Sequence, residues 1–163
     1  MQKIFYTILF LGLALLVGCG TPNDPESIIG GDGGYKVVSK FITSGYAQDV
    51  VVKDTLALIA QGEGGLMIIG ISNPKAPVEL STVDSVKGYG YKLVNKDSVI
   101  YIAAKAFGVT IIEASDPENP VLILSNTQPR PANGFDIMGD FLFTAAGEYG
   151  VKIAYLGDNP AEP

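Results

Sequence analysis

The sequence contains no histidine and no tryptophan, and its single cysteine is Cys19. These absences limit the chemistry of the chain, because Ser-His-Asp and Cys-His catalysis need a histidine base, and zinc sites are built mainly from His and Cys ligands. One cysteine also cannot form a disulfide within the chain. We therefore expect a protein that is not an enzyme and that binds no metal ion and no cofactor.

The charge balance is acidic, with 17 Asp and Glu residues against 11 Lys and Arg residues and a net charge of −6. Negative charge repels the phosphates of nucleic acids and the headgroups of anionic lipids. We therefore expect no nucleic-acid partner and no membrane binding through charge.

The first residues have the pattern of an export signal. Lys3 gives a positive start, residues 4–17 are apolar, and Leu16-Val17-Gly18-Cys19 places small residues just before the cysteine. This pattern resembles a bacterial lipobox, and the resemblance implies cleavage before Cys19 and attachment of diacylglycerol to its thiol. A plain secretory signal and a membrane-spanning helix are the alternatives, although 14 helical residues reach only about 21 Å, short of a hydrocarbon core of about 30 Å.

Residues 1–18 are thus predicted to be a lipoprotein signal peptide that directs the chain to the cell envelope. Lipid on Cys19 would anchor the protein to a bacterial membrane, with its folded part outside the cytoplasm. Residues 19–34 are rich in Gly, Pro, Asn and Asp and are predicted to form a flexible tether. A repeat domain is expected over residues 35–163.

Two copies of one unit, offset by 43 residues, and a partial third copy make up the repeat domain. They span residues 45–87, 88–131 and 132–163. Repetition at a fixed period indicates stacked structural units, since each copy buries its apolar faces against a neighbouring copy. The identical pairs of the first two copies include Gly45/Gly88, Tyr46/Tyr89, Asp54/Asp97, Gly65/Gly108, Ile68/Ile111 and Pro74/Pro117.

Each full repeat is predicted to form four short antiparallel strands, because runs rich in Val, Ile and Leu alternate with Gly, Pro, Asn and Asp. In the first repeat these runs are 48–53, 56–60, 66–71 and 78–83. The third repeat has no counterpart of the fourth run. A strand-like segment before the first repeat, residues 35–43, could supply the missing strand.

The turns carry residues with conformational roles. An aspartate is expected in the turn between the first two strands of each repeat, as a turn residue and not as a metal ligand: Asp54, Asp97 and Asp140. The Ser-Asn-Pro and Ser-Asp-Pro turns are expected to cap backbone groups with their Asx side chains. The third strand follows a glycine that we expect to have a positive φ or to permit a close approach: Gly65, Gly108 and Gly150.

Four antiparallel strands in about 40 residues are the size of a β-propeller blade. The sequences Gly65-Leu66-Met67-Ile68-Ile69-Gly70-Ile71-Ser72-Asn73-Pro74 and Gly108-Val109-Thr110-Ile111-Ile112-Glu113-Ala114-Ser115-Asp116-Pro117 resemble the LVIVD-repeat family. The resemblance implies a propeller-like domain of a bacterial or archaeal surface protein. The family's core has an Asp where this chain has Gly70, Glu113 and Tyr155, so the resemblance carries over an architecture and no reaction.

The number of repeats leaves several architectures open, because closed propellers usually have about four to eight blades. The expected fold class is all-β, with repeats of about 43 residues stacked as propeller blades. Two chains could close a ring of six blades, with residues 35–43 completing the third blade of the same or the partner chain. A β-trefoil-like threefold fold and a truncated propeller are the alternatives.

Functional residues are expected where the repeats differ. The loop between the second and third strands differs in every copy, and its exposed side chains would form an aromatic and acidic patch suited to a protein, a glycan or a cation. Packing of the two aromatic rings against a neighbouring blade is the structural alternative. The candidate residues in these loops are Glu63, Phe107, Glu148 and Tyr149, and Arg130 lies in a second candidate loop between the second and third repeats.

The sequence thus predicts a lipid-anchored repeat protein of the cell envelope that acts as a noncatalytic binding or assembly module. Its expected partners are the membrane, through the anchor, and a second copy of the chain or a protein or glycan ligand. A carboxylate-dependent enzyme using Glu63, Glu148 and Tyr149, and a propeller remnant without a ligand, are the alternatives.

Overall fold

The computed structural model describes residues 36–157, which fall into a unit that ends at Val37 and a second unit that begins at Val38. All the strands belong to the second unit. The predicted signal peptide, Cys19 and the tether lie outside the described residues.

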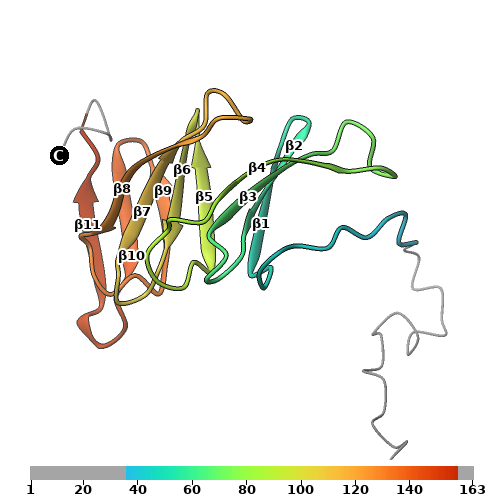
Figure 1. Ribbon diagram of the computed structural model, residues 1–163. Helices are drawn as coiled ribbons and strands as arrows, with labels where there is room; N and C mark the ends of the chain where they lie inside the picture. The colour runs from blue at the N-terminus through green and yellow to red at the C-terminus, as the bar shows by residue number, and fades with distance from the viewer. Residues whose placement is uncertain (1–35, 158–163) are drawn as a thin grey trace, which may run out of the picture. The chain divides into compact units, whose positions relative to one another are not determined.

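Residues 38–157 of the second unit form eleven strands and one short 3-10 helix. Figure 1 shows how the strands are arranged. The first repeat forms β1 (Asp49–Lys53), β2 (Leu56–Ala60), β3 (Leu66–Gly70) and β4 (Val78–Val83). The second forms β5 (Lys92–Lys96), β6 (Val99–Ala103), β7 (Val109–Glu113) and β8 (Val121–Thr127). The third forms β9 (Gly134–Met138), β10 (Phe141–Ala145), η2 (Gly147–Tyr149) and β11 (Val151–Tyr155).

Each repeat forms its own antiparallel sheet, in which neighbouring strands follow one another in sequence. Sheet 1 has the order β1-β2-β3-β4, sheet 2 the order β5-β6-β7-β8, and sheet 3 the order β9-β10-β11. The first strands of successive sheets lie together, β1 beside β5 and β5 beside β9. This is the arrangement of propeller blades, whose first strands lie nearest the common axis, so the prediction of an all-β, blade-like fold is confirmed.

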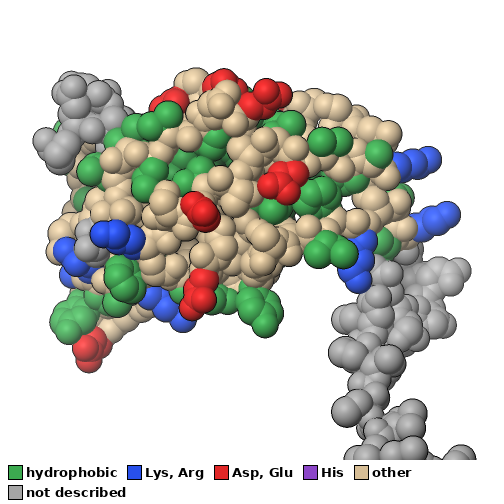
Figure 2. Space-filling view, in the orientation of Figure 1, with side chains coloured by type: hydrophobic (Ala, Val, Ile, Leu, Met, Phe, Trp, Pro, Cys, Tyr) green, Lys and Arg blue, Asp and Glu red, His purple; other side chains and the backbone are tan. Residues whose placement is uncertain are grey.

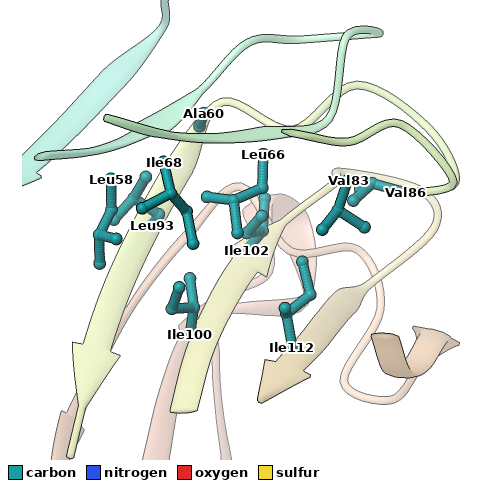
Figure 3. Packing of buried hydrophobic residues seen from close by; sticks show 10 residues of the cluster. All are labelled: Leu58, Ala60, Leu66, Ile68, Val83, Val86, Leu93, Ile100, Ile102 and Ile112. Atoms are coloured by element: carbon teal, nitrogen blue, oxygen red, sulfur yellow. The ribbon is translucent and has the colours of Figure 1, made fainter. Parts of the chain in front are cut away.

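The two middle strands of sheets 1 and 2 are buried on both faces, as their uninterrupted apolar runs predict. One hydrophobic cluster lies between sheets 1 and 2 and is shown in Figure 3. It joins Leu58, Ala60, Leu66, Ile68, Val83, Val86, Leu93, Ile100, Ile102 and Ile112. A second cluster, which includes Tyr101, Val109, Phe135 and Leu142, packs sheet 2 against sheet 3. Sheet 2 is therefore the middle layer (Figure 1).

The junctions between sheets are also joined by hydrogen bonds that recur in successive repeats. Gly62, in the loop after β2, exchanges two backbone hydrogen bonds with Gly90, just before sheet 2. Lys105, in the loop after β6, exchanges the same two bonds with Ala132, just before sheet 3. These paired bonds set the spacing of one sheet to the next through the main chain.

The turn between the first two strands corrects one part of the predicted alignment. Asp54 and Asp97 have positive φ values of 52° and 53°, which a short polar side chain tolerates. In sheet 3 the positive φ, 56°, belongs to Gly139. Asp140 is the residue after it, so the alignment of Asp140 with Asp54 and Asp97 is wrong by one position. Glycine adopts this conformation without strain, because it has no Cβ.

The glycines before the third strands have the expected conformation. Gly65, Gly108 and Gly150 have φ values of 73°, 76° and 73°. The Asx turns are confirmed as well, since Asn73 Oδ1 accepts a hydrogen bond from the backbone N–H of Lys75 at 3.1 Å. Asp116 Oδ1 accepts the equivalent bond from Glu118.

The segment before the first repeat does not complete sheet 3 of its own chain. No strand is assigned within its described part, residues 36–43. From Val38 onward it lies on the face of sheet 1 that is turned away from sheet 2. There Phe41 packs against a cluster formed by Ala57, Ile59, Met67 and Ile69.

Candidate functional site

The loops that follow β2, β6 and β10 all leave the sheets at the same strand end. They contain the candidate residues Glu63, Phe107, Glu148 and Tyr149. We call this end of the sheets the rim. The space-filling view in Figure 2 shows hydrophobic side chains at the surface among acidic ones.

An open hollow of about 470 Å³ lies on the rim beside Glu63. Tyrosine side chains from the starts of two repeats, Tyr46 and Tyr89, line it together with Ser44, Gln61 and the loop itself. Tyr46 is 79% exposed, and Glu63 is exposed too. The hollow therefore offers aromatic surface, a carboxylate and a hydroxyl to solvent at one place.

Gln61 builds the base of this hollow. The residue is fully buried, and its side-chain oxygen Oε1 accepts a hydrogen bond from the backbone N–H of Gly45 at 3.2 Å and one from Ser44 Oγ at 3.3 Å. Its Nε2 donates to the carbonyl oxygen of Gly64 at 3.3 Å. Because a buried amide with satisfied bonds holds its neighbours in place, Gln61 fixes the chain that leads into Tyr46 to the loop that carries Glu63.

Phe107 and Tyr149 occupy equivalent loop positions but have different surroundings. Phe107 is 44% exposed, and its ring packs on Gly88, where a Cβ would lie only 2.5 Å from Phe107 Cδ2. Tyr149 is 63% exposed, and the ammonium group of Lys152 lies 5.4 Å from the centre of its ring. Phe107 thus packs on the segment that leads into its own sheet, while the ring of Tyr149 is exposed on the rim beside Lys152.

Arg130 lies in the connection between sheets 2 and 3, where the peptide bonds before Pro129 and Pro131 are both cis. Its backbone carbonyl accepts a hydrogen bond from Lys152 Nζ, and its side-chain stem lies beside Gly108. Arg130 therefore belongs to the junction of sheets 2 and 3, away from the hollow beside Glu63.

Tyr91 belongs to the same junction. Its hydroxyl donates a hydrogen bond to the carbonyl oxygen of Ala132 at 3.3 Å, and the Lys105 ammonium lies 5.3 Å from its ring centre. Burial raises the pKa of Tyr91 above its ordinary value of 10.0. Its hydroxyl therefore stays protonated at neutral pH and serves as a donor.

The two carboxylates of the enzyme alternative lie on different sheets. Glu63 belongs to a loop of sheet 1 and Glu148 to a loop of sheet 3, with sheet 2 between them. The hollow that Glu63 lines does not include Glu148. Within residues 36–157 no group of three or more His, Cys, Asp or Glu side chains is arranged to hold a metal ion.

Sequence reasoning missed three residues of the hollow: Tyr46, Tyr89 and Gln61. A signal for each was present. Tyr46 and Tyr89 are an identical pair, and Gln61 takes the place held by Ala104 and Ala146 in the other repeats. A polar residue at a position that is otherwise alanine, just before a variable loop, points to a local requirement for hydrogen bonding.

No helix among the described residues is long and apolar enough to cross a membrane. In comparisons with known proteins, the family description of the LVIVD repeat matches residues 44–85 and 98–127. None of the curated proteins compared with the chain matches it.

Proposed function

Since this chain carries LVIVD repeats, we propose that it is a lipid-anchored protein of the cell envelope that binds a glycan on its rim without catalysis. The observation that supports this proposal best is the hollow beside Glu63. A repeat fold alone assigns no activity, so the argument depends on the chemistry of this site.

The side chains of the hollow suit a sugar better than a compact ion. The flat faces of Tyr46 and Tyr89 can pack against the apolar C–H face of a pyranose ring. The Glu63 carboxylate accepts hydrogen bonds from sugar hydroxyls, and carboxylate bonds of this kind are stronger than neutral ones. An open hollow of this size takes one or two sugar units at the surface, which is the scale of a lectin-like contact.

The test is a titration of the full chain, in detergent, with two soluble probes: an oligomer of four N-acetylglucosamine units and one of four glucose units. The chain has no tryptophan, so its fluorescence comes from tyrosines, two of which, Tyr46 and Tyr89, line the hollow. We expect saturable binding of at least one probe. Tyr46→Ala should weaken it about fivefold, because an aromatic contact contributes about 1 kcal/mol.

A matched pair of carboxylate variants controls for charge. Glu63→Gln removes the carboxylate of the hollow, whereas Glu79→Gln removes one on β4, where Glu79 accepts a hydrogen bond from Thr82. Glu63→Gln should weaken binding and Glu79→Gln should not. Absence of binding to both probes, or equal effects of both variants, would contradict the glycan proposal.

The anchor requires its own experiment, because Cys19 lies outside the described residues. The predicted lipobox and the absence of any other cysteine support lipidation at this thiol. Cells that express the full chain and are fed a clickable fatty acid should label it, and Cys19→Ser should abolish the label and release the protein from the membrane fraction. Labelling that persists in Cys19→Ser would refute the proposed anchor.

A further inference from the structure

Residues 38–44, which we call the lead segment, stand on sheet 1 in the place that β4 has on sheet 2. Ser81 of β4 donates its hydroxyl to the carbonyl oxygen of Pro117 at 2.6 Å. Ser39 of the lead segment donates in the same way to Pro74, the equivalent proline one repeat earlier, at 2.5 Å. The lead segment therefore occupies the position of the fourth strand of a sheet that would precede sheet 1.

Sheet 3 lacks this fourth strand among the described residues. A Cβ on Gly65 would lie 2.0 Å from the carbonyl oxygen of Val83 in β4, and one on Gly108 would lie 1.8 Å from that of Thr127 in β8. At Gly150, which has a similar positive φ, no atom of another described residue lies within 4 Å of an added Cβ. The backbone at the start of β11 is thus shaped for a neighbouring strand that residues 36–157 of the same chain do not provide there.

The pair of backbone hydrogen bonds that joins successive sheets needs two residues, one in the loop after the second strand of a sheet and one just before the next sheet. Sheet 3 carries a residue of the first kind and sheet 1 a residue of the second kind. The loop residues Gly62 and Lys105 each pair with a residue just before the next sheet, namely Gly90 and Ala132. The next loop residue in this series is Gly147, whose φ of 61° matches the 64° of Gly62. The residue equivalent to Gly90 and Ala132 at the start of sheet 1 is Ala47, which is exposed while both of its counterparts are buried.

The side chains at these ends show the same relation. Leu93 of β5 is fully buried between sheets 1 and 2, whereas its counterpart Val50 of β1 is 57% exposed. Ile111 of β7 is 8% exposed between sheets 2 and 3, whereas its counterpart Ile153 of β11 is 63% exposed. The chain therefore presents one unfilled half of its own repeat junction at sheet 1 and the other half at sheet 3.

We propose that the partner of these surfaces is a second copy of this chain. The lead segment of each copy adds to β11 of the other as the fourth strand of sheet 3, and Gly147 of each copy pairs with Ala47 of the other. Because sheet 2 separates sheets 1 and 3 within one copy, a copy cannot fill its own junction. Two copies with three sheets each make six blades, within the usual range of about four to eight for closed propellers.

The same contact completes the rim, and this part rests on the proposed function. Tyr89 lies over Gly62 at the junction of sheets 1 and 2, where a Cβ on Gly62 would be 2.7 Å from Tyr89 Cζ. Its counterpart Tyr46 takes the same place over Gly147 of the other copy. Glu148 and Tyr149 then come next to the hollow that contains Tyr46.

The first test links two copies covalently. Two full-length chains with different tags are expressed together, one with Ser39→Cys and the other with Ile153→Cys. Ile68 of β3 pairs with Ser81 of β4 in sheet 1. Ile153 of β11 corresponds to Ile68, and Ser39 of the lead segment corresponds to Ser81, so Ile153 of one copy should pair with Ser39 of the other. We expect a disulfide-linked species with both tags. Mass spectrometry of its peptides should identify a disulfide between the two introduced thiols, which also separates it from linkage through Cys19.

The matched control replaces Ser39→Cys with Ile42→Cys. Ile42 is 84% exposed in the same segment but lies beyond the residues expected to pair with β11. We expect little or no linkage from this control. Absence of a disulfide between the Ser39→Cys and Ile153→Cys chains, or equal linkage from both cysteine positions of the lead segment, would overturn the proposal.

The second test measures mass. Sedimentation equilibrium of the full-length protein in density-matched detergent should give twice the mass that mass spectrometry finds for one chain of the same sample. Ile153→Glu should reduce it to one chain, whereas Val121→Glu, 54% exposed on the outer strand of sheet 2, should not. A single-chain mass for the unaltered protein, or an unchanged double mass in Ile153→Glu, would refute the arrangement. These outcomes do not depend on any glycan, so the binding proposal can fail independently.

Discussion

Replacement of Gly108 by alanine tests whether the close approach of β8 to the start of β7 requires a glycine at this position. A Cβ at this position would lie 1.8 Å from the carbonyl oxygen of Thr127 and 2.7 Å from Arg130 Cγ. An ordinary contact between a Cβ and a carbonyl oxygen is nearly twice as long as the distance to Thr127, so β8 would have to move away from β7. Gly139 is the matched control, because its φ is also positive but no neighbouring atom from residues 36–157 lies within 4 Å of the added Cβ.

The two glycines separate conformational strain from collision. An alanine with a positive φ costs about 1 kcal/mol, and this is the whole expected loss for Gly139→Ala. Gly108→Ala has the same strain plus an overpacking cost of about 1 to 3 kcal/mol. We therefore expect Gly108→Ala to lower the free energy of unfolding by about 3 kcal/mol, and Gly139→Ala by about 1 kcal/mol.

Urea unfolding followed by circular dichroism, at one protein concentration for both variants, measures these losses. The dependence of the free energy on urea should be unchanged, which shows that the compared states are the same. Equal losses in the two variants would refute the reasoning, because the collision with Thr127 would then contribute nothing. Gly139→Asn offers a further check and should be nearly neutral, since asparagine tolerates this conformation well.

Three other changes have outcomes that follow from single side chains. The buried hydroxyl of Thr144 has no hydrogen-bond partner among the described residues. Thr144→Val should therefore raise the free energy of unfolding, measured with urea, by about 1 kcal/mol. A lower free energy of unfolding in this variant would show that the hydroxyl does have a hydrogen-bond partner. Hydrogen bonds from Ser115 lower the pKa of Glu113 below its ordinary 4.5, and hydrogen bonds from Asn119 and Glu118 lower the pKa of Asp116 below its ordinary 3.8. The two carboxylates therefore stabilise the folded state above these ordinary values, and this stabilisation is lost as the pH falls through the lowered pKa values. The urea midpoints of unfolding at pH 7 and pH 3 should differ less in Asp116→Asn than in the unaltered chain. Lys96 Nζ lies 3.0 Å from Asp140 Oδ1 on the surface, so Lys96→Met should cost only about 0.5 kcal/mol, and a double-mutant cycle with Asp140→Ala in high salt should show the coupling disappear.

The repeat made most of the fold predictable from sequence. The predicted strand 56–60 matches β2 and the predicted strand 78–83 matches β4, because Gly, Pro or Asp residues mark the turns on both sides of each strand. The error at Asp140 arose because pairing Asp140 with Asp97 adds an identical residue to the sequence alignment, whereas the backbone pairs Gly139 with Asp97. Only the backbone showed that Gly139 takes the positive φ.

The candidate site was less predictable, because it depends on contacts between segments that are distant in sequence. The loop of Glu63 was identified from its variation among repeats, but the amide of Gln61 and the ring of Tyr46 belong to the hollow through hydrogen bonds and packing. The role of the lead segment was predicted only in part. Its position on sheet 1 follows from the bond between Ser39 and Pro74, which no periodic pattern reveals.

The paired main-chain bonds between Gly62 and Gly90, and between Lys105 and Ala132, have an evolutionary consequence. Side chains take no part in these bonds, and glycine and lysine meet the same requirement in successive loops. The spacing of the sheets is therefore insulated from the identity of the rim residues beside each bond. Mutation can explore new recognition surfaces at Glu63, Phe107 or Tyr149 while the scaffold beneath keeps its dimensions.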